Sequence, residues 1–286
     1  MRIAGFTFVS NAVRLDFPIV PAIRSILPLC AEVVVNVGPS TDDTLELIRS
    51  IDDPRIRIIH GAWDNALGRR MLSAETQRAL DATTGDWAIY IQADEVLHED
   101  GLPILEAAMR KAHDDPRVEA LLVNYLHFYR SFDTVATNRT WYRREVRVVR
   151  RGPDVRSYED AQGFRVGPGT RRIRARRTGA VMHHYGWARP IDALRSKRDL
   201  DQVIYHEGRD HRPGVAELPP WQVGLRRFTG SHPAVAREWI AERHHMGAPG
   251  FQPPVWTRRM AQLAASQLLE RVTGWRAFEY RNYVEV

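Results

Sequence analysis

Ionisable side chains gather where one short apolar run of the sequence ends. Residues 87–91 read Trp-Ala-Ile-Tyr-Ile, and Gln-Ala-Asp-Glu follows at 92–95. Carboxylates at the end of a buried strand are poorly solvated unless a positive group meets them. Hard oxygen ligands of this kind suit Mg²⁺ or Mn²⁺ carrying a phosphorylated substrate. The segment is equally compatible with a solvated acidic loop that follows a core strand.

Two further places in the sequence carry groups suited to catalysis or ligation. Glu159 and Asp160 precede Ala-Gln-Gly, a predicted turn, and a carboxylate there can take a proton from a hydroxyl group. Either acid can instead pair with a nearby arginine. His183 and His184 stand together at the end of an apolar run. Because successive side chains of a strand point to opposite faces, at most one of these rings is expected to be a ligand.

The first third of the chain predicts the elements that would position these groups. Short runs rich in β-branched residues predict strands, and longer segments with apolar residues at helical spacing predict helices between them. The predicted strands are 2–9, 32–37, 55–60 and 87–91, and the predicted helices are 18–29, 41–51 and 71–82. This alternation predicts an α/β fold with a mostly parallel sheet flanked by helices. Ligands of such sheets bind beyond the carboxyl ends of the strands.

From about residue 127 the pattern changes. Residues 141–151 and 171–177 alternate basic and apolar side chains, which predicts half-exposed antiparallel strands. Elsewhere the sequence predicts a helix at 103–112, a strand at 118–125, and helices at 192–205, 234–245 and 258–272. The second half is therefore expected to be antiparallel, with a helical C-terminal region.

The composition is that of a globular protein with a basic charge. The chain has 286 residues, of which 44% are hydrophobic, and a formal net charge of +6, which favours phosphate-bearing partners, anionic lipid or nucleic acid. A single cysteine, Cys30, favours a reducing compartment. The sequence shows neither a signal peptide nor an apolar run long enough to span a bilayer. We expect a cytoplasmic protein that contacts the inner membrane peripherally through its arginines.

Five segments, in this order, resemble the family-2 glycosyltransferases, which are inverting enzymes of the GT-A fold. Strand 32–37 followed by Pro-Ser-Thr-Asp-Asp-Thr is similar to the family's strand and aspartate-rich turn, and helix 71–82 leads into Gly-Asp-Trp as it does there. Ile-Gln-Ala-Asp-Glu at 91–95 stands where the family carries its Asp-x-Asp metal motif. Tyr-Glu-Asp-Ala-Gln-Gly-Phe at 158–164 resembles the catalytic-base segment. His-His-Tyr-Gly-Trp at 183–187 resembles the segment with the family's late metal-site histidine.

The resemblance implies transfer of a sugar from a nucleoside-diphosphate sugar to a hydroxyl of a glycan or lipid-linked acceptor, in bacterial surface-glycan assembly. It implies Asp160 as the base, with Glu159 as the second choice. It also implies Asp94 and His184 as ligands of a divalent cation, Mn²⁺ or Mg²⁺, which would stabilise the departing diphosphate. The residues expected at the nucleotide sugar are Ser10, Asn11, Val37, Gln92, Ala93 and Asp94.

The sequence departs from the family pattern in two places. Val-Gly-Pro at 37–39 replaces Asp-Asp-Gly, which removes a carboxylate that often contacts the nucleobase. Gln92 replaces the first aspartate of the metal motif, which removes one charge from the site. An amide at this position can still hydrogen-bond a ribose hydroxyl or a metal-bound water.

We expect residues 1–190 to form the catalytic domain, with 2–95 as the nucleotide-sugar half and 96–190 as the acceptor half, and 191–286 to be an accessory region. An alternative is a non-enzymatic protein that binds nucleic acid or acidic glycan through the arginine-rich strands. A further alternative is a di-iron centre, because Glu-x-x-His occurs at 95–98 and at 242–245. The glycosyltransferase interpretation predicts no nucleic-acid partner.

Overall fold

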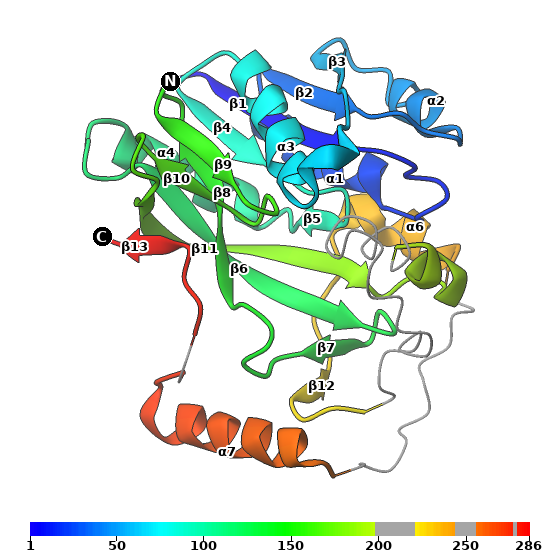
Figure 1. Ribbon diagram of the computed structural model, residues 1–286, viewed down its shortest axis with the longest axis vertical. Helices are drawn as coiled ribbons and strands as arrows, with labels where there is room; N and C mark the ends of the chain where they lie inside the picture. Colours follow the sequence, from blue (N-terminus) through cyan, green and yellow to red (C-terminus); the bar gives the residue numbers. More distant parts are fainter. Residues whose placement is uncertain (198–220, 244–255, 277–278) are drawn as a thin grey trace.

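The computed structural model describes residues 1–197, 221–243, 256–276 and 279–286, and one curled sheet runs through these residues (Figure 1). The strands are β1 (Ile3–Val9), β2 (Glu32–Val37), β3 (Ile56–His60), β4 (Trp87–Tyr90), β5 (Glu95–Leu97), β6 (Ala120–Tyr129), β7 (Thr134–Ala136), β8 (Arg144–Arg150), β9 (Val155–Tyr158), β10 (Gly163–Val166), β11 (Arg171–Trp187), β12 (Leu225–Arg227) and β13 (Tyr283–Glu285). The helices are α1 (Ile19–Ile26), α2 (Thr44–Arg49), α3 (Arg70–Ala82), α4 (Gly101–His113), α6 (Arg237–Ala241) and α7 (Arg258–Thr273), with 3-10 turns η1 (Leu27–Leu29), η2 (Asn65–Leu67) and η3 (Ala234–Ala236). Residues 191–197 are also helical.

The first half of the chain forms the predicted parallel sheet, in the order β3-β2-β1-β4. Alternate residues of β2 pack on opposite faces, so Val33 and Val35 join the core under α1 and α4, while Val34 packs with residues of α3. Helices on both faces explain why these strands are nearly continuous runs of apolar residues. The strands predicted at 2–9, 32–37, 55–60 and 87–91 are therefore confirmed to within a residue or two.

The second half of the sheet is mixed. β8 lies antiparallel between β4 and β6, and β11 lies parallel to β6. As a result β1, β4, β6 and β11 all run in one direction, and their carboxyl ends meet at the same edge. The predicted α/β fold with a parallel half, antiparallel elements and C-terminal helices is confirmed. It is the arrangement expected of the GT-A fold.

The prediction of half-exposed strands is right for 171–177 and wrong for 141–151. In β11, Ile173 and Ala175 are buried and the arginines between and around them are at least partly exposed. In β8, however, five consecutive residues are buried, including the fully buried Arg147. β8 is an internal strand covered on both faces, and a buried arginine is tolerated there because it has an acidic partner.

The C-terminal part of the chain contains α6 and α7 and also adds two strands. β12 pairs with β7, and β13 pairs in parallel with β11. The helix predicted at 192–205 is present over residues 191–197, and the remainder lies outside the described residues, as do 244 and 245 of the helix predicted at 234–245. Among the described helices, none is both long enough and apolar enough to cross a bilayer. The division at residue 190 remains a prediction.

Candidate active site at the carboxyl ends of the strands

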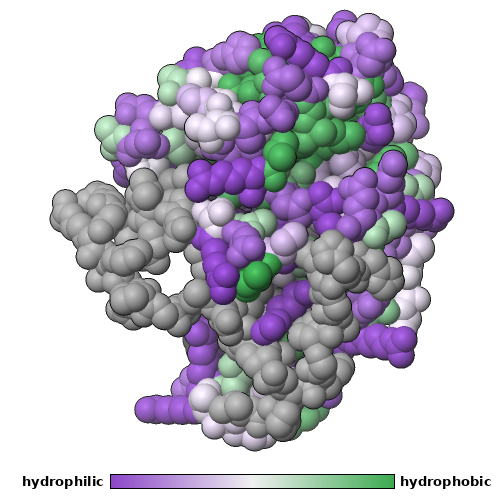
Figure 2. Space-filling model, turned by 90° about the vertical axis from the view of Figure 1, so that its right-hand side faces the viewer, coloured by the Kyte–Doolittle hydropathy of each residue, from purple (hydrophilic) through white to green (hydrophobic). Residues whose placement is uncertain are grey.

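A cavity of about 320 Å³ lies at the edge where the parallel strands end. Figure 2 looks onto this side of the molecule and shows apolar surface bordered by hydrophilic residues. The cavity is lined by Phe8, Val9, Ser10, Leu15, Phe17, Trp63, Leu72, Gln92, Ala93, Asp94, Tyr142, Asp160, Gln162, His184, Trp187 and Lys197. Its volume and its mixture of aromatic walls with a few polar groups are those of a small-molecule site. Six of the nine predicted site residues line it: Ser10, Gln92, Ala93, Asp94, Asp160 and His184.

Three predicted site residues do not line the cavity. Val37 is 3% exposed and packs in the core. The side-chain oxygen of Asn11 accepts a hydrogen bond from the backbone N–H of Thr41 at 2.9 Å, so Asn11 shapes a neighbouring loop. Glu159 forms an ion pair with Arg69 at 2.7 Å. The sequence pattern placed these residues at the correct edge of the sheet but could not determine where their side chains point.

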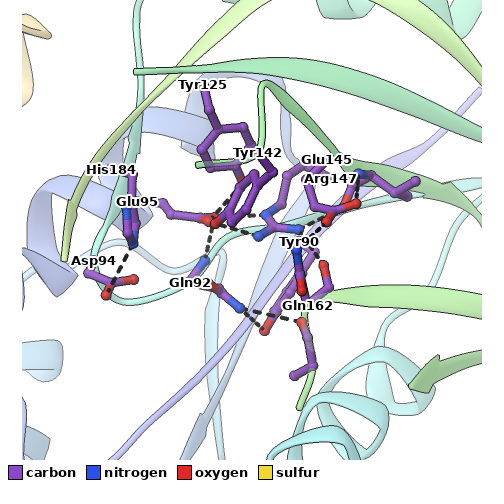
Figure 3. Close-up of polar contacts among 12 residues, drawn as sticks. Tyr90, Gln92, Asp94, Glu95, Tyr125, Tyr142, Glu145, Arg147, Gln162 and His184 are labelled. Carbon is purple, nitrogen blue, oxygen red and sulfur yellow. Dashed lines mark hydrogen bonds and ion pairs between the residues drawn. The ribbon is translucent and has the colours of Figure 1, made fainter. Parts of the chain in front are cut away.

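Asp94 is the centre of the charged part of the cavity (Figure 3). Its Oδ2 atom lies 3.6 Å from Nε2 of His184 and 3.1 Å from Nζ of Lys197. Burial alone would raise the pKa of Asp94, but the Lys197 ammonium and His184 hold this pKa well below its ordinary value. Asp94 is therefore an ionised carboxylate in a nearly closed environment.

His127 orients the ring of His184. Nε2 of His127 lies 2.7 Å from the carbonyl oxygen of Tyr142, which can only accept, so this nitrogen is protonated. Burial, together with the charge of His184, lowers the pKa of His127 well below its ordinary value, so its Nδ1 is an acceptor. Nδ1 of His184, 3.0 Å away, then donates to it. Nε2 of His184 is consequently turned toward Asp94.

This donor set fits a divalent cation held by two protein ligands. The carboxylate oxygen of Asp94 and Nε2 of His184 face each other at 3.6 Å, which is too long for a hydrogen bond. No group of three or more possible ligands occurs within the described residues. A bound cation would therefore need phosphate oxygens or water to complete its coordination. Lys197 would have to leave the oxygen that it now contacts.

A buried ion pair supports the Gln-Ala-Asp-Glu turn from beneath (Figure 3). Arg147 and Glu95 are both fully buried and form two hydrogen bonds, at 2.8 and 2.9 Å. Glu95 also accepts from the hydroxyl of Tyr125 at 2.7 Å and from the backbone N–H of Gln92 at 3.1 Å. Because each carboxylate oxygen has two donors, the turn that carries Asp94 is held in one conformation.

The same network reaches the loop that carries Asp160. Arg147 donates to the carbonyl oxygen of Gln162 at 3.0 Å, and the amide of Gln92 donates to that of Ala161 at 3.3 Å. An aspartate at position 92 has no hydrogen to donate, so the amide links the two loops where a carboxylate could not. Asp160 itself lies between Glu159 and Ala161, whose φ angles are +53° and +63°. Left-handed non-glycine residues on both sides of Asp160 indicate a turn under strain, which the surrounding contacts maintain.

Glu145 supports this loop from its other side. Its carboxylate accepts from the amide of Gln162 at 2.8 Å and from that of Asn282, in the C-terminal segment, at 3.4 Å. Burial raises the pKa of Glu145 to about 7, although the charge of Arg147 acts in the opposite direction. The Asp160 loop therefore rests on a buried acid that is only partly ionised at neutral pH.

Trp63 fills the space beside Gly38, in the segment where the sequence departs from Asp-Asp-Gly. A Cβ atom added to Gly38 would lie 1.9 Å from Nε1 of Trp63, so residue 38 has no room for a side chain. The Trp63 ring also lies 5.8 Å from that of Phe8, which lines the same cavity. Its Nε1 hydrogen has no acceptor among the described residues. The departure from Asp-Asp-Gly is thus accompanied by an aromatic wall.

His183 lies on the opposite face of β11 from His184, as the strand alternation predicted. Its ring packs against Phe128 and His232, and its Nδ1 lies 3.3 Å from the hydroxyl of Tyr185. The di-iron alternative is not supported, because Glu95 lies on strand β5 and its carboxylate is occupied by Arg147. His245 lies outside the described residues.

Three residues of the site were not singled out from the sequence: Lys197, His127 and Arg147. Glu95 was named only as part of the acidic turn and of the Glu-x-x-His pair at 95–98. It gave a usable signal, as a second acid directly after a buried strand. Arg147 stands in an arginine-rich run that favours a solvated strand face. His127 and Lys197 reach the site only through the path of β6 and of the helix after β11. Such contacts depend on the fold and leave no local pattern.

Solved structures of glycosyltransferases resemble the chain weakly. One is TarS residues 1–349 of S. aureus in complex with UDP, at 17% identity and a TM-score of 0.37, covering 45% of this chain and 36% of that one. Another is glucosyl-3-phosphoglycerate synthase from Mycobacterium tuberculosis with Mn²⁺, UDP and phosphoglyceric acid, at 22% identity and a TM-score of 0.31, covering 44% and 43%. A third, S. aureus TarS, has 12% identity and a TM-score of 0.41, covering 72% and 40%. The chain thus spans less than half the length of each. No curated protein matches it.

The sequence profile described as Glycosyl transferase family 2 matches residues 19–164. This match covers more than half of the chain and includes the parallel strands from β2 onward, the Gln-Ala-Asp-Glu turn and the Asp160 loop. The chain belongs to glycosyl transferase family 2.

Proposed function

We propose that this protein is an inverting glycosyltransferase that moves a sugar from a nucleoside-diphosphate sugar to an acceptor hydroxyl. The observation that carries the proposal is the meeting of Asp94, Asp160 and His184 around one cavity, although three separate parts of the chain supply them. An inverting transfer is a single displacement, so it needs a base for the acceptor and a means of stabilising the leaving diphosphate.

The diphosphate would lie at Asp94 and His184, which would hold Mn²⁺ or Mg²⁺. When bound, such a cation neutralises the charge that develops on the leaving oxygen. Ser10, Gln92 and Ala93 line the same cavity and would contact the nucleotide sugar. Phe8 and Trp63 also line the cavity. We propose that they stack on the nucleobase in place of the contact that the missing carboxylate would make.

Asp160 is the proposed general base. Its side chain lines the cavity and forms no ion pair with another described residue, so its oxygens are available to an acceptor hydroxyl. Glu159 has an arginine partner, Arg69, at 2.7 Å. This contrast supports Asp160, and not Glu159, as the base. We assign to Glu159 the positioning of the loop.

The acceptor is proposed to be a glycan or a lipid-linked sugar of bacterial surface-glycan assembly, and the site of action the cytoplasm. A reducing location is consistent with Cys30, a free thiol that is buried and whose pKa burial raises to about 12. These assignments follow from family membership and from the sequence, and they name no particular sugar.

The alternative of a nucleic-acid or acidic-glycan binder loses much of its basis in the structure. Its arginine-rich strands turn many of their guanidinium groups inward or onto acids of the same chain. Arg171 and Arg174 pair with Glu119, and Arg177 pairs with Glu285. A surface already neutralised in this way has little charge left for a polyanion.

The test compares Asp160→Asn with Glu159→Gln. Removal of a general base typically lowers the rate by about 10² to 10⁴, whereas nucleotide binding should persist because the amide keeps the shape of the side chain. Sugar transfer is measured with single-turnover kinetics, and nucleotide affinity by calorimetry. Near-normal transfer by Asp160→Asn would refute the assignment, and a much larger loss in Glu159→Gln would identify the other acid as the base.

A further inference from the structure

The outer face of α7 is apolar. Leu268 and Val272 are 63% and 76% exposed, and Ala261 and Ala265 are exposed on the same side. These positions are spaced by four, three and four residues, so they form one stripe along the helix. Figure 1 shows α7 at the end of the molecule farthest from the parallel strands. This stripe is unusual, because exposed apolar residues on a surface helix are normally isolated.

The opposite face of α7 fixes this orientation. Leu263 is 4% exposed and faces the protein. Glu270 pairs with Arg143 at 3.2 Å and with Arg276 at 2.8 Å, and Arg276 is itself buried. These contacts anchor the helix by its polar inner side. The apolar stripe therefore cannot turn inward without breaking two ion pairs.

Positive and aromatic residues surround the stripe. At 100° per residue, Arg258 and Arg271 lie on its two sides, and both are exposed without an ion-pair partner among the described residues. Trp256 and Trp275 lie just beyond the two ends of the helix and are 62% and 60% exposed. An apolar stripe with flanking arginines and terminal tryptophans is typical of a helix that lies in the interface of a membrane.

We propose that α7 binds the surface of an anionic lipid bilayer, with Leu268 and Val272 entering the acyl boundary and the two flanking arginines at the headgroups. A second copy of the chain fits this face less well. Pairing of two such stripes would bring two arginines of each copy, Arg258 and Arg271, to the rim of one interface, where like charges oppose the contact. The proposal is independent of the transfer reaction. The sequence predicted a peripheral membrane contact, and the proposal assigns that contact to α7.

Co-sedimentation with vesicles tests the proposal. The full chain should bind vesicles of phosphatidylcholine with phosphatidylglycerol at least about tenfold more tightly than phosphatidylcholine alone, and less tightly at high salt. Leu268→Glu with Val272→Glu should weaken binding at least about tenfold, and Arg258→Gln with Arg271→Gln should weaken only the binding to anionic vesicles. Ile104→Glu is the matched control, because Ile104 is an exposed apolar residue of another helix, α4. Binding that is absent, or unchanged in the Leu268 and Val272 variant, would overturn the proposal.

A labelling experiment locates the contact. Leu268→Cys can be modified selectively with a polarity-sensitive fluorophore, since Cys30 is 4% exposed and is the single natural cysteine. Anionic vesicles should shift its emission to the blue, while the same probe at Ile104→Cys should not respond. If the Leu268 probe instead shifts with rising protein concentration and without vesicles, the face is an interface between copies and the membrane proposal is wrong.

Discussion

A divalent cation at the proposed site would require the oxygen of Asp94 that Lys197 now contacts. The ammonium is 3.1 Å from that oxygen in the free protein, so cation binding must first separate the pair. Lys197→Met should therefore strengthen Mn²⁺ binding in the absence of nucleotide, by about tenfold, because a positive charge next to the site is removed. Calorimetry of the variant against wild type measures this. Lys111→Met, an exposed lysine of α4, is the control.

Unchanged or weaker Mn²⁺ binding in Lys197→Met would mean that the lysine does not compete for Asp94. It would also remove the support that the geometry gives to a cation at this position. Nucleotide titrations in the presence of Mn²⁺ separate this case from simple misfolding, because a misfolded variant would lose nucleotide binding as well.

Glu145 should make stability depend on pH. Burial raises its pKa from 4.5 to about 7 in the folded protein, so the folded state retains a proton that the unfolded state releases between these values. The resulting stabilisation is complete below pH 4.5 and disappears as the pH rises through 7. Relative to Glu145→Gln, the unfolding free energy of wild type should fall by roughly 1 to 3 kcal/mol across this range.

Urea unfolding at several pH values measures the difference. In the control Glu46→Gln, which changes an exposed glutamate of α2, the unfolding free energy should depend on pH as it does in wild type. If the unfolding free energies of Glu145→Gln and wild type changed with pH in parallel, the Glu145 carboxyl would titrate alike in the folded and unfolded states.

At the scale of elements, the Arg147–Glu95 pair joins strands β8 and β5 beneath the site. Replacing one member of a buried ion pair leaves an uncompensated charge, which typically costs about 3 to 5 kcal/mol. Arg147→Met should therefore lower stability by that amount. The double variant with Glu95→Met should recover much of the loss, because both charges are then removed. Denaturant unfolding of the two single variants and the double variant gives the coupling energy.

The control is Arg172→Met, because Arg172 is exposed on β11. This substitution should change stability by less than about 0.5 kcal/mol. A double variant that is as unstable as Arg147→Met alone would show that the pair contributes through its hydrogen bonds to Tyr125 and Gln92 and not through mutual neutralisation.

The strands of the parallel half could be predicted from the sequence because each one is a short apolar run, and burial on both faces produces that pattern directly. Their order along the chain also placed Ser10 and Asp94 at one edge. The burial of Arg147 could not be predicted in this way. Its partner lies 52 residues away along the chain, and an isolated arginine between valines has the same pattern in a central strand as in an exposed one.

At the scale of the whole molecule, the C-terminal segment supports the Asp160 loop. The carbonyl oxygen and the side chain of Asn282 accept hydrogen bonds from Arg165 at 2.7 and 3.1 Å, and its amide donates to Glu145. Asn282→Ala should lower the rate of sugar transfer by about tenfold and leave nucleotide affinity unchanged, because the loop is loosened while the donor half is intact. Glu285→Ala, which removes a partly exposed ion pair with Arg177, is the control.

An equal loss of nucleotide affinity in Asn282→Ala would show that the segment supports the whole cavity and not the loop alone. Hydrogen exchange of residues 158–166 gives an independent measure, since their amides should exchange faster in the variant than in wild type.

The pairing of β13 with β11 also sets an order of events during translation. Asn282 is added to the growing chain 117 residues after Arg165, which corresponds to roughly 6 to 23 seconds at elongation rates of about 5 to 20 residues per second. Throughout that interval the parallel half can already be folded, while the Asp160 loop lacks one of its supports. The nascent protein would therefore acquire the capacity to hold a nucleotide before it acquires the capacity to use one.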